Sequence, residues 1–229
     1  MNRILNTLAQ KWPEYLLEIL VITIGILGAF ILNSWKEDRA ESVYEISIIQ
    51  ELMTSTERDS LQISYIIRRY DQHDSVVTLL KEKMLMDVPY NDTLASMFSR
   101  VSYFDIISTD FTVFENLKST GITLIKNQEL RTAIPRYYGL ISHIRLVHQE
   151  FILPIYFREN IYPKYFRSFS WRTGAVPVDF EALKDEPEMY VALDYVMNDV
   201  GFYKRIYQSL QQNNAQLRSA LRKELNSRK

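Results

Sequence analysis

Residues 15–32 read YLLEILVITIGILGAFIL, an eighteen-residue run in which Glu18 is the only charged side chain. The hydrocarbon core of a bilayer is about 30 Å thick and needs about 20 mostly apolar residues in helical form. Trp12 and Trp35 flank the run and would lie about 34 Å apart in a helix that rises 1.5 Å per residue. We therefore predict a transmembrane helix over residues 13–35, with Trp12, Tyr15 and Trp35 as its interface anchors.

The main alternative for this run is a secretory signal peptide. It fits poorly, because the apolar residues continue to Leu32 and no small-residue cleavage site precedes the charged residues 36–38. Residues 1–12 carry apolar side chains at helical spacing, so we expect a short interfacial segment in the lipid headgroups.

The composition limits the remaining chain to a folded, helical domain. Of the 229 residues, 47% are hydrophobic and 13% aromatic, which favours a packed core over disorder. Six glycines and seven prolines favour long helices over many short strands. The net charge of −1 gives no reason to expect nucleic acid, and the lack of cysteine excludes disulfides and thiolate chemistry.

Two long helices dominate the pattern after the apolar run. Residues 36–86 contain no proline or glycine, so the first helix is expected to continue to Met86. Its apolar stripe is Ile49, Leu52, Thr56, Ile63, Ile66, Tyr70, Val77, Leu80 and Met84. Short helices are expected near residues 92–101 and 111–120, and a longer one after Asn127. Residues 168–186 read as the longest loop.

The last helix is expected from Pro187 to about Asn226, with the most regular heptad-like seam of the chain. The seam residues are Leu193, Val196, Val200, Tyr203, Tyr207, Leu210, Asn214, Leu217, Leu221 and Leu225. Asn214 interrupts this seam, either to fix the register of helix pairing or as a solvated edge. Residues 36–60 hold seven acidic and three basic side chains, whereas residues 201–229 hold seven basic and one acidic. An antiparallel return of the last helix would bring these blocks together, although surface ion pairs contribute at most about 1 kcal/mol each. The predicted fold is thus all-α, with one transmembrane helix continuing into an antiparallel helical bundle over residues 36–229.

The segment EYLLEILVITIGILGAFILNSWKEDRAE (residues 14–41) resembles the amino-terminal signature of an uncharacterised bacterial family of single-pass inner-membrane proteins. The shared features are Glu18, the run Ile24-Gly25-Ile26-Leu27, and the residues Asn33, Trp35 and Glu37. Residues 114–138, FENLKSTGITLIKNQELRTAIPRYY, are also similar to the family pattern. The resemblance implies a cytoplasmic amino terminus and a helical domain outside the cytoplasm, and it implies no activity.

The predicted transmembrane helix carries one polar face. At about 100° per residue, the residues that share it are Glu18, Ile22, Gly25, Ala29 and Asn33. Small residues allow close helix approach, and polar groups allow interhelical hydrogen bonds. We interpret this set as a face for self-association or for docking on another membrane protein. Instead of packing against another helix, Glu18 could extend its side chain to the membrane interface, since it is three residues from Tyr15. An alternative function is a homo-oligomeric channel with Glu18 near the pore.

No catalytic, metal or cofactor motif stands out. His73, His143 and His148 do not match a metal-ligand pattern. The pairs Arg68/His73 and Arg136/His143 loosely match HEPN-type helical ribonucleases, which gives a second alternative. The aromatic stretch of residues 155–171 fits a packed end of the bundle, a partner or lipid surface, or, least well, nucleic acid. We predict a non-enzymatic membrane-anchored sensor, scaffold or accessory subunit without a cofactor, whose partners are the lipid bilayer and either a second copy or another membrane protein.

Overall fold

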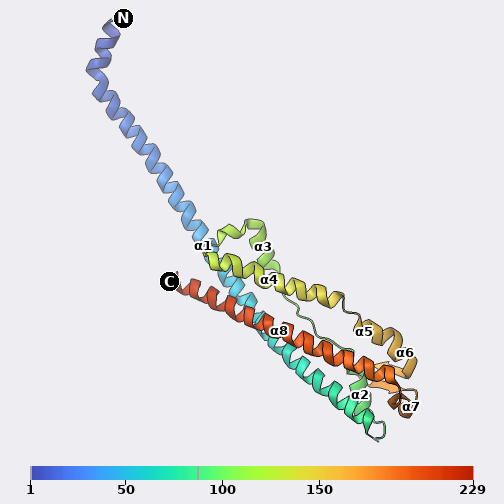
Figure 1. The fold of residues 1–229 in the computed structure, drawn as a ribbon. Helices are drawn as coiled ribbons and strands as arrows, with labels where there is room; N and C mark the ends of the chain where they lie inside the picture. The colour runs from blue at the N-terminus through green and yellow to red at the C-terminus, as the bar shows by residue number, and fades with distance from the viewer. Residues whose placement is uncertain (1, 87, 229) are drawn as a thin grey trace. The chain divides into compact units, whose positions relative to one another are not determined.

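The computed structural model describes residues 2–86 and 88–228 and is all-α, as the sequence predicts (Figure 1). In chain order the elements are α1 (Asn2–Leu85), α2 (Asp92–Arg100), α3 (Thr112–Thr120), the 3-10 turn η1 (Ile122–Leu124), α4 (Gln128–Gln149), α5 (Leu153–Tyr156), the π-helical turn η2 (Phe157–Ile161), α6 (Tyr162–Tyr165), β1 (Phe166–Ser170), β2 (Gly174–Pro177), α7 (Phe180–Lys184) and α8 (Pro187–Ser227). The chain divides into two compact units, Met1–Ile48 and Ile49–Lys229.

Within the first unit, α1 contains the apolar run. Among the described residues, α1 is the one helix long and apolar enough to cross a membrane, and its most apolar window has a mean hydropathy of 2.4 with no buried residue. Trp12 and Trp35 are each 59% exposed and Tyr15 is 46% exposed. The interfacial-segment prediction depends on the side chains of residues 1–11, which lie outside the described part, as do the side chains of residues 13 and 14. The bounds predicted for the membrane span and the domains stay predictions.

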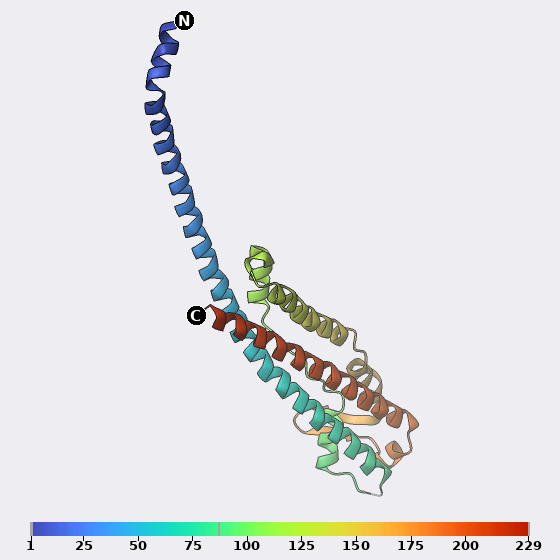
Figure 2. The same ribbon diagram turned by 60° about the vertical axis from the view of Figure 1, so that its left-hand side comes forward.

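In the second unit the rest of α1 packs against α8, and α4 lies beside α8 in both views (Figures 1 and 2). Every residue of the predicted α1 stripe from Ile49 to Met84 is buried. The predicted α8 seam is buried from Leu193 to Leu221, while Leu225 is half-buried at the end of the helix. Helical periodicity therefore identified both faces of this core.

The pairing of α1 with α8 is antiparallel. Among the described residues, four polar side-chain pairs on the surface of the two helices show this, because the two residue numbers of each pair add to the same total. The pairs are Glu57 with Arg218 (3.5 Å), Ser64 with Gln211 (3.2 Å), Asp71 with Lys204 (2.5 Å) and Lys81 with Asp194. All of them lie on the surface, so they fix the register of the pair more than they stabilise it.

A polar network lies inside the core, where α1, α4 and α8 meet. Asn214 is only 1% exposed, and its amide donates to the carbonyl of Thr56 (2.9 Å) and to the hydroxyl of Tyr137 (3.0 Å). The Tyr137 hydroxyl donates in turn to the carboxylate of Asp59 (2.9 Å), which is also buried. Asn214 is thus a buried link between three helices, and the solvated-edge interpretation is wrong.

Local capping follows the sequence signals. The side chain of Asn91 accepts a hydrogen bond from the backbone of Leu94 at the start of α2, and Asn127 accepts from Glu129 and Leu130 at the start of α4. Gly121 ends α3 with a φ of +110°, a conformation that favours glycine. Pro135 lies inside α4 without ending it.

The prediction of a long loop over residues 168–186 is wrong. Residues 166–170 and 174–177 form an antiparallel hairpin, and α7 follows it. An isolated two-stranded hairpin is marginal in water, but this one packs on α2. Gly174 makes that contact possible, because a Cβ there would lie 2.5 Å from the backbone of Ala95. From the aromatic stretch, the buried ring of Tyr162 contacts the ring of Phe166 in β1 (5.5 Å between centroids) and that of Phe157 (5.7 Å).

Candidate functional site

The predicted transmembrane face is open in the structure of the single chain. Glu18, Ile22, Gly25, Ala29 and Asn33 are all exposed. A Cβ added at Gly25 would meet nothing within 4 Å. The amide of Asn33 donates to the carboxylate of Glu37 one turn further along α1 (2.7 Å). Exposed apolar side chains surround this face in the described part of the chain.

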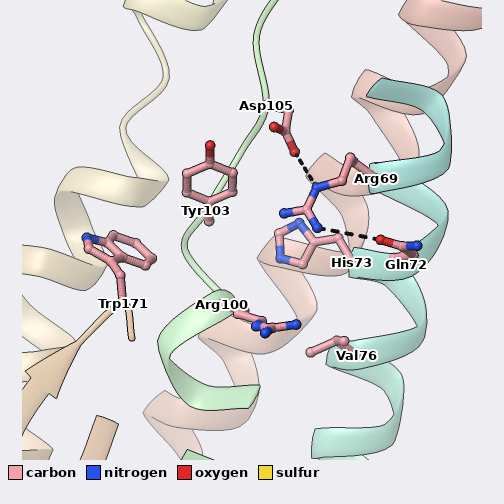
Figure 3. Close-up of a pocket in the computed structure, with 8 residues that line it drawn as sticks. All are labelled: Arg69, Gln72, His73, Val76, Arg100, Tyr103, Asp105 and Trp171. Carbon is pink, nitrogen blue, oxygen red and sulfur yellow. Dashed lines mark hydrogen bonds and ion pairs between the residues drawn. The ribbon is translucent and has the colours of Figure 1, made fainter. Parts of the chain in front are cut away.

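The second unit contains a cavity of about 350 Å³ beside α1 and α2, here called the Arg69 cavity (Figure 3). Figure 3 shows Arg69, Gln72, His73 and Val76 projecting from α1, Arg100 from the end of α2, and Trp171 from the turn between β1 and β2. Tyr103 and Asp105 complete the lining from the segment after α2. The four α1 residues share one helix face, because they follow one another at steps of three, one and three.

Arg69 is held in place by two partners. Its Nε lies 3.2 Å from a carboxylate oxygen of Asp105, and one terminal nitrogen lies 3.5 Å from the Gln72 side-chain oxygen. The backbone carbonyl of Asp105 accepts a hydrogen bond from the buried hydroxyl of Tyr70 (2.9 Å), which anchors the segment to α1. The Asp105 carboxylate therefore neutralises one of the two arginines of the cavity.

Arg100 supplies the second cation. It is exposed, and among the described residues no hydrogen bond or ion pair involves its side chain. Tyr103 and Trp171 meet edge to face with centroids 5.7 Å apart, and the guanidinium of Arg69 lies 6.0 Å from the Tyr103 ring. The cavity thus combines an uncompensated positive charge with flat aromatic walls.

His73 closes the inner side of the cavity. It is 8% exposed, its Nε2 lies 2.9 Å from the carbonyl oxygen of Val101, and its ring packs edge-on against Phe104 (5.1 Å). The pKa of His73 is lowered, mainly because the ring is buried. The neutral ring therefore donates from Nε2 to the carbonyl and keeps Nδ1 as an acceptor.

The other residues predicted from the sequence are not brought together here. Arg68 is exposed, Arg136 lines a separate hollow between α4 and α8, and His143 is exposed on α4. Within one chain, the two arginine–histidine pairs of the ribonuclease alternative do not share a cavity. The sequence analysis named His73, and it included Trp171 only as the last residue of the aromatic stretch 155–171. It missed Arg69, Arg100 and Asp105. The spacing of Arg69, Gln72, His73 and Val76 on one helix face was a signal that could have found part of the site.

Comparison with protein-family models, with curated proteins and with solved structures finds no match. The resemblance to the bacterial membrane family stays a prediction.

Proposed function

We propose that this protein is a non-enzymatic, membrane-anchored sensor whose helical domain binds a small anion in the Arg69 cavity. The observation that carries the anchor is the exposed apolar run of α1, because the core helix of a soluble protein would bury such a run. The exposed fraction of these side chains supports contact with lipid. The proposed location is the bacterial inner membrane, with the amino terminus in the cytoplasm and the helical domain outside it.

Two observations support an anionic ligand. The cavity presents two arginines against one carboxylate, and Arg100 has the free donors that bind carboxylate or phosphate groups. Its volume of about 350 Å³ fits a small molecule. The carboxylate of Asp105 is already bound to Arg69, which favours a role in positioning over a role as a base.

The anchor is tested by alkaline carbonate extraction of membranes that contain the full chain. The wild-type protein should stay in the pellet, and a variant with Ile24→Lys and Leu27→Lys should move to the supernatant. A wild-type protein that is extracted fully would contradict the anchor. Because the chain has no native cysteine, Ser227→Cys reports the side of the membrane. A membrane-impermeant maleimide should label it in intact spheroplasts, and labelling only after lysis would reverse the proposed orientation.

The transmembrane face is proposed to mediate self-association. Gly25→Leu should lower the dimer fraction in liposomes, measured by energy transfer between labelled copies, because the added side chain separates the helices. Gly28→Leu is the matched control, since it adds the same side chain about 60° away on the helix. Equal dimer fractions in wild type and Gly25→Leu would refute self-association through this face.

The cavity is tested by calorimetric titration of the full chain in lipid nanodiscs with benzoate and with inorganic phosphate. One of the two probes should bind, and Arg100→Gln should weaken that binding at least about tenfold, as expected for a lost charge-assisted hydrogen bond. Arg158→Gln removes an exposed arginine outside the cavity and should leave the affinity unchanged. Failure of both probes, or equal loss in the two variants, would contradict the anion site.

A further inference from the structure

A second cavity lies on the other side of the aromatic core, between the end of α4, α5 and the first half of α8. Its volume is about 560 Å³, larger than that of the Arg69 cavity and typical of small-molecule sites. We call it the Tyr203 cavity, after the buried tyrosine in its wall. A chain of ring contacts from His73 through Phe104 (5.1 Å) to Phe151 (4.7 Å) separates the two cavities.

Aromatic rings form much of the wall. They come from Phe151, Tyr156, Tyr195, Phe202 and Tyr203. Tyr203 is buried and meets Phe151 and Phe202 edge to face, with centroids 5.1 Å and 5.4 Å apart. Tyr195 and Phe202 are 60% and 43% exposed. Their rings therefore lie at the mouth of the cavity, where the rest of the described chain leaves them uncovered.

The charges of this wall are all negative. Glu150, Glu188 and Asp199 line it, and the described lining residues include no lysine, arginine or histidine. Just outside the lining, Lys164 pairs with Glu188 and His148 stacks on Tyr203 (4.2 Å). Glu188 is already bound, since it accepts hydrogen bonds from Lys164, Tyr156 and Tyr165. These bonds lower the pKa of Glu188 to about 2.

Asp199 differs from Glu188. In the described part of the chain, no hydrogen bond or ion pair involves its carboxylate. Partial burial alone raises the pKa of Asp199. A carboxylate that loses water without gaining a partner is stabilised by any cation that enters the cavity.

We propose that the Tyr203 cavity binds an organic cation that carries an apolar group, such as an aryl- or alkylammonium. The exposed rings of Tyr195 and Phe202 are available to attract a cation through their π faces, whereas the buried ring of Tyr203 is already stacked on His148 (4.2 Å). The Asp199 carboxylate neutralises the charge of the cation. The size and the apolar remainder of the wall accommodate the hydrocarbon part. This inference does not depend on the anion site, which has the opposite charge and a separate set of residues.

The test uses the full chain in nanodiscs of zwitterionic lipid, titrated calorimetrically with phenyltrimethylammonium and with benzenesulfonate. The cation should show saturable binding, and the sulfonate should not. Asp199→Asn keeps the shape of the side chain and should weaken cation binding about tenfold. Phe202→Leu keeps an apolar side chain without the ring and should weaken it severalfold.

Two controls make the result specific. Asp194→Asn removes one negative charge from the same helix outside the cavity, and Arg100→Gln alters the other cavity. Both should bind phenyltrimethylammonium as the wild type does. Equal binding of the sulfonate, an unchanged affinity in Asp199→Asn, or equal losses in Asp194→Asn and Asp199→Asn would overturn the proposal. The absence of saturable binding at millimolar concentrations of phenyltrimethylammonium would also overturn it. The same holds if the apparent affinity for this cation depends only on protein concentration, because a second copy would then cover the cavity.

Discussion

Replacing Asn214 with alanine tests the buried network that joins α1, α4 and α8. The amide of Asn214 donates two hydrogen bonds, to the Thr56 carbonyl and to the Tyr137 hydroxyl. Each hydrogen bond contributes about 1 kcal/mol net, and the truncated side chain leaves a small cavity in a close-packed core. The free energy of unfolding should therefore fall by about 2 to 4 kcal/mol.

The assay is thermal unfolding of the full chain in detergent, followed by near-ultraviolet circular dichroism. This signal reports the packed tyrosines of the domain and not the apolar run of α1. A domain of this size loses about 2 to 4 °C of melting temperature per kcal/mol, so the midpoint should fall by roughly 4 to 16 °C.

The matched control is the neighbouring residue. Among the described residues, Asn213 bonds only to the carbonyl of Ser209 in its own helix, and alanine is the better helix former. Asn213→Ala should change the stability by less than about 0.5 kcal/mol. If Asn214→Ala were as harmless as Asn213→Ala, the network would not hold the three helices together as described.

Three further predictions address the hairpin, the buried carboxylate and the surface charges. Gly174→Ala should destabilise the domain by more than about 2 kcal/mol, since it combines a φ of +98° with a close contact to Ala95; Gly121→Ala, where only the positive φ is strained, should cost less in the same melts. Burial raises the pKa of Asp59 from its ordinary value of 3.8. The protonated carboxyl therefore stabilises the folded domain fully below pH 3.8, and this stabilisation is lost as the pH rises through the pKa of the folded state. Asp59→Asn should accordingly stabilise the domain at pH 7 relative to wild type, with the gain vanishing in acid, and a gain that grows toward acid would contradict this reasoning. Glu57→Gln removes an exposed ion pair with Arg218 and should change the stability by less than about 1 kcal/mol in the same assay.

Much of the fold was predictable because it depends on local periodicity. The apolar stripe of α1 and the seam of α8 repeat every three or four residues over long stretches, and burial follows both. The caps at Asn91 and Asn127 were also readable, since a side chain bonds to a backbone group within three residues. The hairpin of β1 and β2 could not be predicted from the sequence, because its stability comes from packing on α2.

The candidate sites were less predictable for the same reason. Arg69, Arg100 and Trp171 reach one cavity from three distant segments, and no spacing in the sequence connects them. The Tyr203 cavity likewise combines the end of α4 with α5 and α8. Asn214 was ambiguous by sequence, since a polar residue in a heptad-like seam fits either a register-setting link or an edge.

The sequence by itself determined the apolar run, the all-α class and the faces that α1 and α8 bury, because hydrophobicity at a helical period is a property of neighbouring residues. Only the tertiary structure decided which polar groups meet. The contacts of Asn214 with Thr56 and Tyr137, and the opposite charges of the two cavities, arise where segments far apart in the chain pack together, and no local pattern records such a meeting.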